Sequence, residues 1–159
     1  ADYIVNELGF DAAINYRTDD LSKALAHECP RGIDVYFENV GGRVFDAVMP
    51  RLNTFARIPV CGLIAQYNAT ELPPGPDRLS LLMGTILTRQ MTVRGFIIFD
   101  TFAPLYPEFA KQMTQWIAEG RIHYREEIID GLVNAPKAFI GLLRGDNFGK
   151  RVIRLGQPS

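Results

Sequence analysis

Residues that could carry chemistry gather in four stretches, each of which follows a short apolar run. They are Tyr16-Arg17, Glu38 to Gly42, Cys61 to Tyr67 and Phe96 to Phe99. In an open parallel sheet the carboxyl ends of the strands meet at one edge, where loops present backbone N–H groups to phosphates. Each stretch alone is compatible with a plain loop, and Gly41-Gly42 lacks the Gly-x-Gly-x-x-Gly spacing of a phosphate-binding turn. Together the stretches predict a ligand site at one edge of a sheet.

Two other kinds of active site are poorly supported. Cys29 and Cys61 have no neighbouring His or Cys at ligand spacing, and neither His27 nor His123 has a second His or Cys four residues on. We therefore expect no metal site and assign both cysteines to apolar packing. The chain also lacks a Gly-x-Ser-x-Gly sequence, which disfavours a hydrolase of that type.

Apolar patterning predicts the elements that would position these stretches. Strands are expected at residues 12–16, 33–37, 55–61 and 91–99, with helices after Asp20, near Arg43 and near Leu79. Short strands that alternate with helices are typical of a parallel sheet wrapped by helices, so the expected fold class is α/β. Further along, the pattern predicts a long amphipathic helix stopped by Gly120, strands at 124–129 and 150–155, and a helix between Asn134 and Gly145.

The composition is that of a globular protein. The chain has 159 residues, of which 47% are hydrophobic and 22% charged, with a net charge of −1. These values disfavour disorder and leave no general attraction to nucleic acid or anionic lipid. No apolar run approaches the roughly 20 residues of a membrane-spanning helix. Two cysteines and no visible secretory signal lead us to expect a cytoplasmic protein that does not associate with membranes.

The charges are unevenly distributed along the chain. Residues 1–50 carry four basic and nine acidic side chains, whereas residues 51–159 carry thirteen and nine. A solvated surface with uneven charge explains this pattern, and so does an anionic-ligand site on the basic part. The sequence leaves both explanations open.

Several motifs follow one another in a fixed order. The most specific are Asn39-Val40-Gly41-Gly42, Leu72-Pro73-Pro74-Gly75-Pro76 and Gly145-Asp146-Asn147-Phe148-Gly149-Lys150. In this order the sequence resembles the medium-chain dehydrogenase/reductase superfamily, in particular its zinc-independent, NADP-dependent branch. That branch contains prostaglandin reductases, leukotriene B4 12-hydroxydehydrogenases and alkenal double-bond reductases. The resemblance covers essentially the whole chain.

The resemblance implies a set of cofactor-binding residues. Tyr16 would contact the 2′-phosphate of NADP, and Asn39 would contact the sugar or diphosphate. Cys61 and Gly62 would line the wall beside the diphosphate and the nicotinamide. Phe96, Ile97 and Ile98 would pack on the nicotinamide and offer backbone hydrogen bonds to its carboxamide, and Asn147 would reach the cofactor from the other lobe.

Tyr67 is the candidate catalytic residue, since the resemblance places it nearest the substrate, and it is also expected to be one of the cofactor-binding residues. Reducing an α,β-unsaturated aldehyde or ketone requires a hydride at the β-carbon, a proton at the α-carbon and stabilisation of the charge that develops on the carbonyl oxygen. A tyrosine hydroxyl can supply that stabilising hydrogen bond while the nicotinamide carries the hydride chemistry. A purely positional role for Tyr67 remains an alternative.

The resemblance further implies a chain that is the C-terminal fragment of a two-lobed enzyme. Residues 1–120 would form a partial Rossmann-like dinucleotide-binding domain without its first two strands, and residues 121–159 a segment of the catalytic lobe. In the strand order 3-2-1-4-5-6, the two absent strands lie between the strands expected at 12–16 and 33–37. We therefore expect the fragment itself to have little or no activity.

Two alternative functions remain at this stage. The intact enzyme could be a quinone oxidoreductase in place of an enone or enal reductase. The chain could also be a catalytically inactive remnant that serves as a dimerisation or nucleotide-binding module. In both cases the strand near Met91 to Phe99 is the expected site of homodimer contact.

Overall fold

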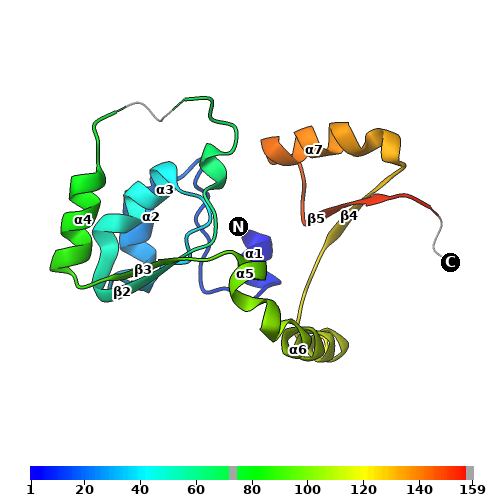
Figure 1. Cartoon of the computed structure of the whole chain (residues 1–159), viewed down its shortest axis with the longest axis horizontal. Coiled ribbons are helices and arrows are strands. Elements are labelled where there is room, and N and C mark those ends of the chain that lie inside the picture. The colour runs from blue at the N-terminus through cyan, green and yellow to red at the C-terminus, as the bar shows by residue number, and fades with distance from the viewer. Residues whose placement is uncertain (72–74, 157–159) are drawn as a thin grey trace. The chain divides into compact units, whose positions relative to one another are not determined.

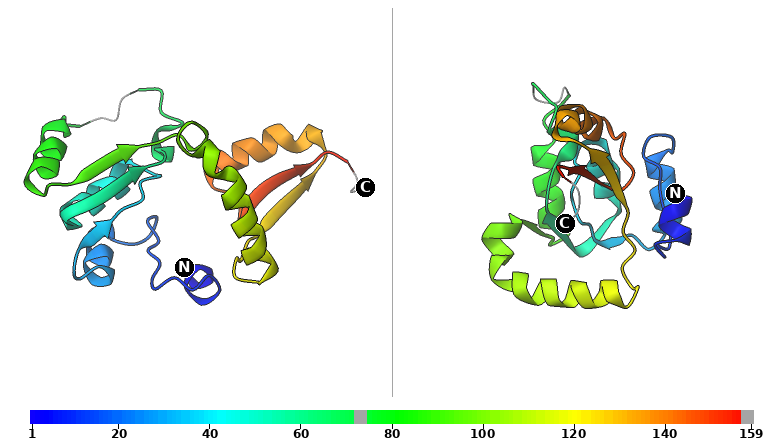
Figure 2. Two further views of the ribbon diagram at one scale, coloured as in Figure 1. Left: turned by 60° about the horizontal axis from the view of Figure 1, so that its bottom comes forward. Right: turned by 90° about the vertical axis from the view of Figure 1, so that its right-hand side faces the viewer.

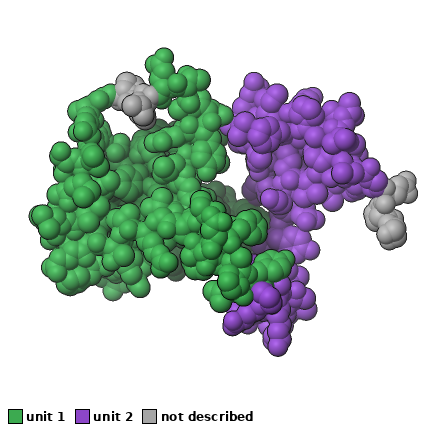
Figure 3. All heavy atoms as spheres, viewed as in Figure 1, with its two compact units in different colours: residues 1–106 green, residues 107–159 purple. Residues whose placement is uncertain are grey.

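The computed structural model describes residues 1–71 and 75–156 and divides into two compact units. The first unit is Ala1–Tyr106 and the second is Pro107–Ser159 (Figure 3). Leu72, Pro73 and Pro74 of the Pro-Pro-Gly-Pro motif lie outside the described residues. The assignment of residues 1–120 and 121–159 to two lobes of a larger enzyme stays a prediction.

A three-stranded parallel sheet forms the centre of the first unit, as the sequence predicts. Its strands are β1 (Ile33–Val35), β2 (Leu52–Val60) and β3 (Thr92–Gly95), in the spatial order β1-β2-β3 (Figures 1 and 2). An isolated bridge between Glu38 and Val60 continues the pairing of β1 and β2 into the loop that follows β1. The α/β class with parallel strands and flanking helices is confirmed.

The predicted strand at residues 12–16 is wrong. Residues 12–15 have no regular secondary structure and lead into a turn, in which the backbone N–H groups of Thr18 and Asp19 donate to the carbonyl oxygen of Asn15 at 3.1 and 2.8 Å. A strand is stable only when a neighbour accepts its backbone hydrogen bonds, and within residues 1–71 and 75–156 no strand lies beside it. The side chains of Asn15 and Asp19 bond to the turn's backbone in its place.

The α-helices of the first unit are α1 (Asp2–Asn6), α2 (Leu21–Glu28), α3 (Gly42–Val48), α4 (Leu79–Thr88) and α5 (Ile98–Phe102). Of these, α2, α3 and α4 begin close to where the sequence predicts. The Asp20 side chain caps α2 by accepting from the backbone N–H of Lys23 at 3.2 Å. Helix α5 was not predicted; β3 ends at Gly95, and the apolar residues that follow turn into this helix.

The core of the first unit is small and lies between the sheet and its helices. Its buried residues are Val48, Met49, Leu52, Ala56, Ile58 and Met91. Leu25 of α2, Phe45 of α3 and Ile86 of α4 pack against them. This packing fixes β2 in the middle of the sheet and leaves the loops after the strands at the surface.

Helix α6 (Tyr106–Ala118) belongs to the second unit from Pro107 onward, and its last turn precedes Gly120. A strand-helix-strand segment follows it. Strands β4 (Glu126–Asp130) and β5 (Lys150–Arg154) pair in parallel, and α7 (Ala135–Arg144) connects them (Figure 1). Gly145 ends α7 in the left-handed conformation, with φ of 75°. The strands predicted at 124–129 and 150–155 are therefore confirmed to within two residues. No helix in the described part of the chain is long and apolar enough to cross a membrane.

Candidate functional site

The loops that follow β1 and β2 are joined by backbone hydrogen bonds. Cys61 N–H donates to the carbonyl oxygen of Glu38 at 2.8 Å, and Ala65 N–H donates to that of Val40 at 2.9 Å. These bonds extend the parallel pairing beyond the ends of the strands. Two of the predicted stretches, Glu38 to Gly42 and Cys61 to Tyr67, therefore form one surface.

The carboxylate of Glu38 shapes the first of these loops. Glu38 is only 2% exposed, and its Oε1 accepts hydrogen bonds of 2.7 Å from the backbone N–H groups of both Val40 and Gly41. Gly41 and Gly42 have φ values of 76° and 56°, a conformation that glycine adopts without strain. This role of Glu38 was not predicted, although a carboxylate just ahead of Asn-x-Gly-Gly is a recognisable signal for such a turn.

A second oxygen of the same carboxylate has no hydrogen bond. Glu38 Oε2 is buried and lacks a partner among the described residues. Burial, together with the negative charge of nearby Glu38, raises the pKa of the Tyr36 hydroxyl above its usual value. The base of the loop is thus a buried acidic environment.

Three predicted site residues converge at Gly62. A Cβ atom on Gly62 would lie 2.8 Å from Asn39 Oδ1 and 3.1 Å from the Tyr67 hydroxyl oxygen. Both distances are shorter than an ordinary van der Waals contact, so the polar ends of Asn39 and Tyr67 occupy the space that a larger residue would need. These two groups come from different loops, which the backbone bonds described above bring together.

An open groove of about 650 Å³ lies next to this convergence. Its walls come from the segments after β2 and β3, including Cys61, Tyr67, Phe96 and Ile97 of the predicted site. Asp100 and Thr101 also line the groove and were not predicted, because they belong to α5. The predicted residue Ile98 begins α5 and is half-exposed, but it is not among the lining residues.

The backbone around Phe96 is partly committed to other hydrogen bonds. Phe96 N–H donates to the carbonyl oxygen of Val60 at 3.3 Å, and the Ile97 carbonyl oxygen accepts from Thr101 N–H at 2.9 Å. The Phe96 ring packs edge-on against the rings of Phe37 and Phe102, with centroids 6.1 and 5.5 Å apart. The ring is therefore held in an aromatic cluster at the side of the groove.

Tyr16 is not among the residues that line the groove. It is 47% exposed, and its carbonyl oxygen accepts a hydrogen bond from the guanidinium of Arg43 at the start of α3. The guanidinium carbons of Arg43 and Arg17 lie 5.8 and 6.0 Å from the centroid of its ring. Tyr16 is thus fixed to the first turn of α3 and has two positive charges beside it.

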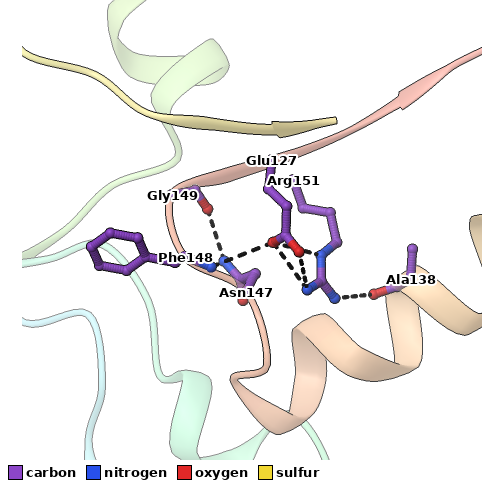
Figure 4. Close-up of polar contacts among 6 residues, drawn as sticks. All are labelled: Glu127, Ala138, Asn147, Phe148, Gly149 and Arg151. Atoms are coloured by element: carbon purple, nitrogen blue, oxygen red, sulfur yellow. Dashed lines mark hydrogen bonds and ion pairs between the residues drawn. The ribbon is translucent and has the colours of Figure 1, made fainter. Parts of the chain in front are cut away.

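Asn147 belongs to the second unit, where its Nδ2 donates to the carbonyl oxygen of Gly149 at 2.8 Å (Figure 4). The following residue, Phe148, donates its N–H to Glu127 at 3.4 Å. Glu127 in turn forms a two-pronged ion pair with Arg151 (Figure 4). The Asn147 turn is therefore attached to β4 and β5 by a charged network that the sequence did not reveal.

The described residues offer no evident metal site. Within 1–71 and 75–156, no three His, Cys, Asp or Glu side chains are grouped so that they could hold one ion. Cys61 is exposed at the groove and Cys29 is half-buried, and neither forms a disulfide.

Comparisons with known proteins agree on one family. The profile described as "Zinc-binding dehydrogenase" matches residues 3–119. The NADPH-dependent curcumin reductase of Escherichia coli (strain K12) is 61% identical over 148 residues, which are 93% of this chain and 43% of that protein. The NADP(+)-dependent 2-alkenal reductase of Nicotiana tabacum is 40% identical over 157 residues, which are 98% of this chain and 44% of that protein.

The same relationship appears in three dimensions. A crystal structure of CurA in complex with NADPH from Vibrio vulnificus matches with a TM-score of 0.93 and 58% identity, over 99% of this chain and 47% of that one. The chain thus spans a little less than half the length of the relatives that it matches.

Proposed function

Because the chain belongs to the zinc-binding dehydrogenase family, we propose that it is part of an NADP-dependent oxidoreductase that reduces the carbon–carbon double bond of α,β-unsaturated aldehydes or ketones. The observation that carries the proposal is the convergence of Asn39 and Tyr67 over Gly62, at the edge of a groove. The names of two relatives, a curcumin reductase and a 2-alkenal reductase, supply the reaction class.

The residues at the sheet edge fit a bound dinucleotide. Because Gly62 has no side chain, Asn39 Oδ1 and the Tyr67 hydroxyl can both lie against it, and the Gly41-Gly42 turn allows a close approach to the backbone. An amide and a hydroxyl both donate and accept hydrogen bonds, as sugar hydroxyls and diphosphate oxygens require. We assign Asn39 to the sugar or diphosphate, and Cys61 and Gly62 to the adjacent wall.

The segment after β3 would hold the nicotinamide. Its carboxamide needs one donor and one acceptor from the protein. Since Phe96 N–H and the Ile97 carbonyl are already bonded, we assign the Phe96 carbonyl and the Ile97 N–H to this task. Ile98 would add apolar contact, and Asn147 would bind the cofactor from the second unit.

Tyr67 would act on the substrate. When bound, the reduced nicotinamide supplies the hydride for the β-carbon. The Tyr67 hydroxyl donates a hydrogen bond to the carbonyl oxygen of the substrate, where negative charge develops, and water that enters the open groove supplies the proton for the α-carbon. Tyr67 is 65% exposed, so its hydroxyl is accessible to a substrate in the groove.

The test uses the protein as its gene encodes it. We expect alkenal-dependent NADPH oxidation on the order of 10 per second. Tyr67→Phe should lower kcat about 100-fold, because loss of one oxyanion donor acts on the transition state, and should weaken NADPH binding far less. Tyr124→Phe, an exposed tyrosine of the second unit, is the matched control and should have no effect.

Two results of the same assay would contradict the proposal. Faster turnover of a quinone than of an alkenal would identify a quinone oxidoreductase. NADPH binding without turnover of either acceptor would identify an inactive nucleotide-binding remnant. An effect of Tyr67→Phe below threefold on kcat would leave the enzyme class intact but reduce Tyr67 to a positional role.

Homodimer formation through β3 belongs to the same proposal, as does a cytoplasmic location. Strand β3 is an edge of the described sheet, and all four of its residues are exposed, so its free backbone groups can pair with a second copy. Val93→Lys should convert the dimer to a monomer in light scattering, whereas Leu81→Lys on exposed α4 should not. A dimer that survives Val93→Lys would place the contact elsewhere.

A further inference from the structure

Asp100 is the one charged side chain among the described residues that line the groove after β2 and β3. It lies in the first turn of α5 (Figure 1), three residues after Ile97, which we assign to the nicotinamide. The other described residues of the lining are uncharged at neutral pH, and apolar side chains such as Val60 and Leu63 are among them. A single charge in an otherwise uncharged groove can select substrates by their charge.

The carboxylate of Asp100 is not neutralised by a described basic side chain. Within residues 1–71 and 75–156, Asp100 takes part in no ion pair. The first turn of a helix favours an acidic residue, which gives Asp100 a structural reason to be there. Helix α5 has only five residues, however, and its partial charge does not cancel a full negative charge. The charge of Asp100 therefore remains available to act on a molecule in the groove.

The size of the groove brings a bound substrate within range of this charge. The groove has a volume of about 650 Å³, whose cube root is roughly 9 Å, close to the Debye length at physiological ionic strength. Salt therefore screens the interaction only in part. The apolar walls of the groove exclude water from a bound substrate and strengthen the interaction further. A substrate with a negative charge is repelled, whereas a neutral one is not.

We propose that Asp100 is a specificity-determining residue that rejects enones and enals carrying a carboxylate, so that the groove selects apolar acceptors that are neutral or positively charged. This inference rests on the proposed function and deepens it. Repulsion of a carboxylate on the substrate acts in the ground state and in the transition state alike, so it raises KM more than it lowers kcat. The charge that develops on the carbonyl oxygen during reduction is common to all these substrates and cancels when two of them are compared.

The test compares three acceptors that differ in one substituent. They are 4-phenylbut-3-en-2-one with a carboxylate, a carboxamide or a trimethylammonium group at the para position, reduced at saturating NADPH by the protein as its gene encodes it. In the wild type, kcat/KM should be lower for the carboxylate than for the carboxamide. Asp100→Asn should raise the carboxylate-to-carboxamide ratio of kcat/KM about 5- to 20-fold, mainly through KM, and should lower the corresponding ratio for the trimethylammonium compound.

Further variants separate the charge of Asp100 from its place in α5. Asp100→Glu keeps the charge and should keep the wild-type ratios, whereas Asp100→Lys reverses it and should change them by about the square of the Asp100→Asn factor. Glu108→Gln is the matched control, since Glu108 is an exposed acid in the first turn of α6 and does not line the groove. It should leave all ratios unchanged. Thermal unfolding of each variant verifies that it is folded.

Ionic strength provides a readout that a merely structural role of Asp100 would not change. Raising the salt to 1 M should bring the wild-type ratios toward those of Asp100→Asn and should hardly change those of the variant. Equal ratios in wild type and Asp100→Asn, or a shift of the carboxylate and trimethylammonium ratios in the same direction, would overturn the inference and leave the proposed function standing. So would an enzyme that reduces alkenals but none of the three aryl enones. If the protein reduces neither alkenals nor these enones, both the inference and the proposed function fail.

Discussion

The buried carboxylate of Glu38 accepts a 2.7 Å hydrogen bond from the backbone N–H of Gly41, and thereby fixes the turn from which Asn39 projects. A second bond of equal length comes from Val40 N–H. The side chain that positions the loop therefore lies directly before it in the sequence. Its effect on the site passes through the backbone, since Asn39 approaches Gly62 only if this turn keeps its shape.

Removal of the Glu38 carboxylate should destabilise the first unit. Glu38→Ala leaves the buried N–H of Gly41 and the partly buried N–H of Val40 without acceptors, which we expect to lower the free energy of unfolding by about 2 to 4 kcal/mol. Glu38→Gln keeps an acceptor oxygen and should lower the free energy of unfolding by about half as much as Glu38→Ala. Glu7→Ala, at an exposed position after α1, is the control and should change stability by less than about 0.5 kcal/mol. Urea denaturation measures all three, and equal stability of Glu38→Ala and wild type would show that water replaces the carboxylate.

The raised pKa of Tyr36 predicts a stability change at alkaline pH. The unfolded chain has the usual tyrosine pKa, near 10, whereas burial and the charge of Glu38 keep the folded hydroxyl protonated to higher pH. The unfolded state therefore loses its proton first, so the contribution of Tyr36 is fully present below pH 10 and declines as the pH rises above it. Denaturation of wild type and Tyr36→Phe between pH 8 and pH 11 should show a difference in unfolding free energy that shrinks above pH 10. A difference that is constant with pH would contradict this.

How much of the fold could be predicted from the sequence depends on how far apart in the chain the interacting residues lie. The cap of α2 was predicted correctly because Asp20 and Lys23 are three residues apart. Strand β2 was predicted at 55–61 from the apolar residues near its end, and it begins three residues earlier, at Leu52. The strand at 12–16 failed because pairing depends on a distant neighbour that its own residues do not encode. Helix α5 was missed because Phe96 to Phe99 are residue types that favour strands.

The candidate site shows the same limit. Strand ends could be identified from the sequence, so Asn39, Gly62 and Tyr67 were chosen individually. Their convergence depends on the backbone bonds between two loops, and the contact of Arg43 with Tyr16 spans 27 residues, so neither could be derived from local patterns.

Gly62→Ala should impair the cofactor site while leaving the fold intact. The new Cβ would lie 2.8 Å from Asn39 Oδ1 and 3.1 Å from the Tyr67 hydroxyl, so both side chains must move. They are the ends of flexible side chains, and we therefore expect a loss of stability below about 1 kcal/mol. NADPH affinity, measured by calorimetry, should fall about tenfold or more.

The control is Gly84→Ala in α4, where a Cβ meets nothing within 4 Å. This variant should keep full NADPH affinity and raise the free energy of unfolding by about 0.5 to 1 kcal/mol. Unchanged NADPH affinity in Gly62→Ala would separate this convergence from cofactor binding.

The second unit offers a comparison of two ion pairs on the same pair of strands. Arg151 and Glu127 are 3.0 Å apart with side chains 10% and 37% exposed, and Arg151 also donates to the carbonyl oxygen of Ala138 at 3.0 Å. Arg154 and Asp130 are 3.3 Å apart but 45% and 74% exposed. Because the Arg151 guanidinium is nearly buried, Glu127→Gln removes its counter-charge and should destabilise the unit by about 1 to 3 kcal/mol. Asp130→Asn acts on a solvated pair and should lower the free energy of unfolding by at most about 1 kcal/mol.

Hydrogen exchange of the β4 and β5 amides measures both variants within this unit, and 1 M salt should reduce the effect of Asp130→Asn more than that of Glu127→Gln. Equal protection from hydrogen exchange in Glu127→Gln and Asp130→Asn would show that the Arg151–Glu127 pair is as solvated as the Arg154–Asp130 pair.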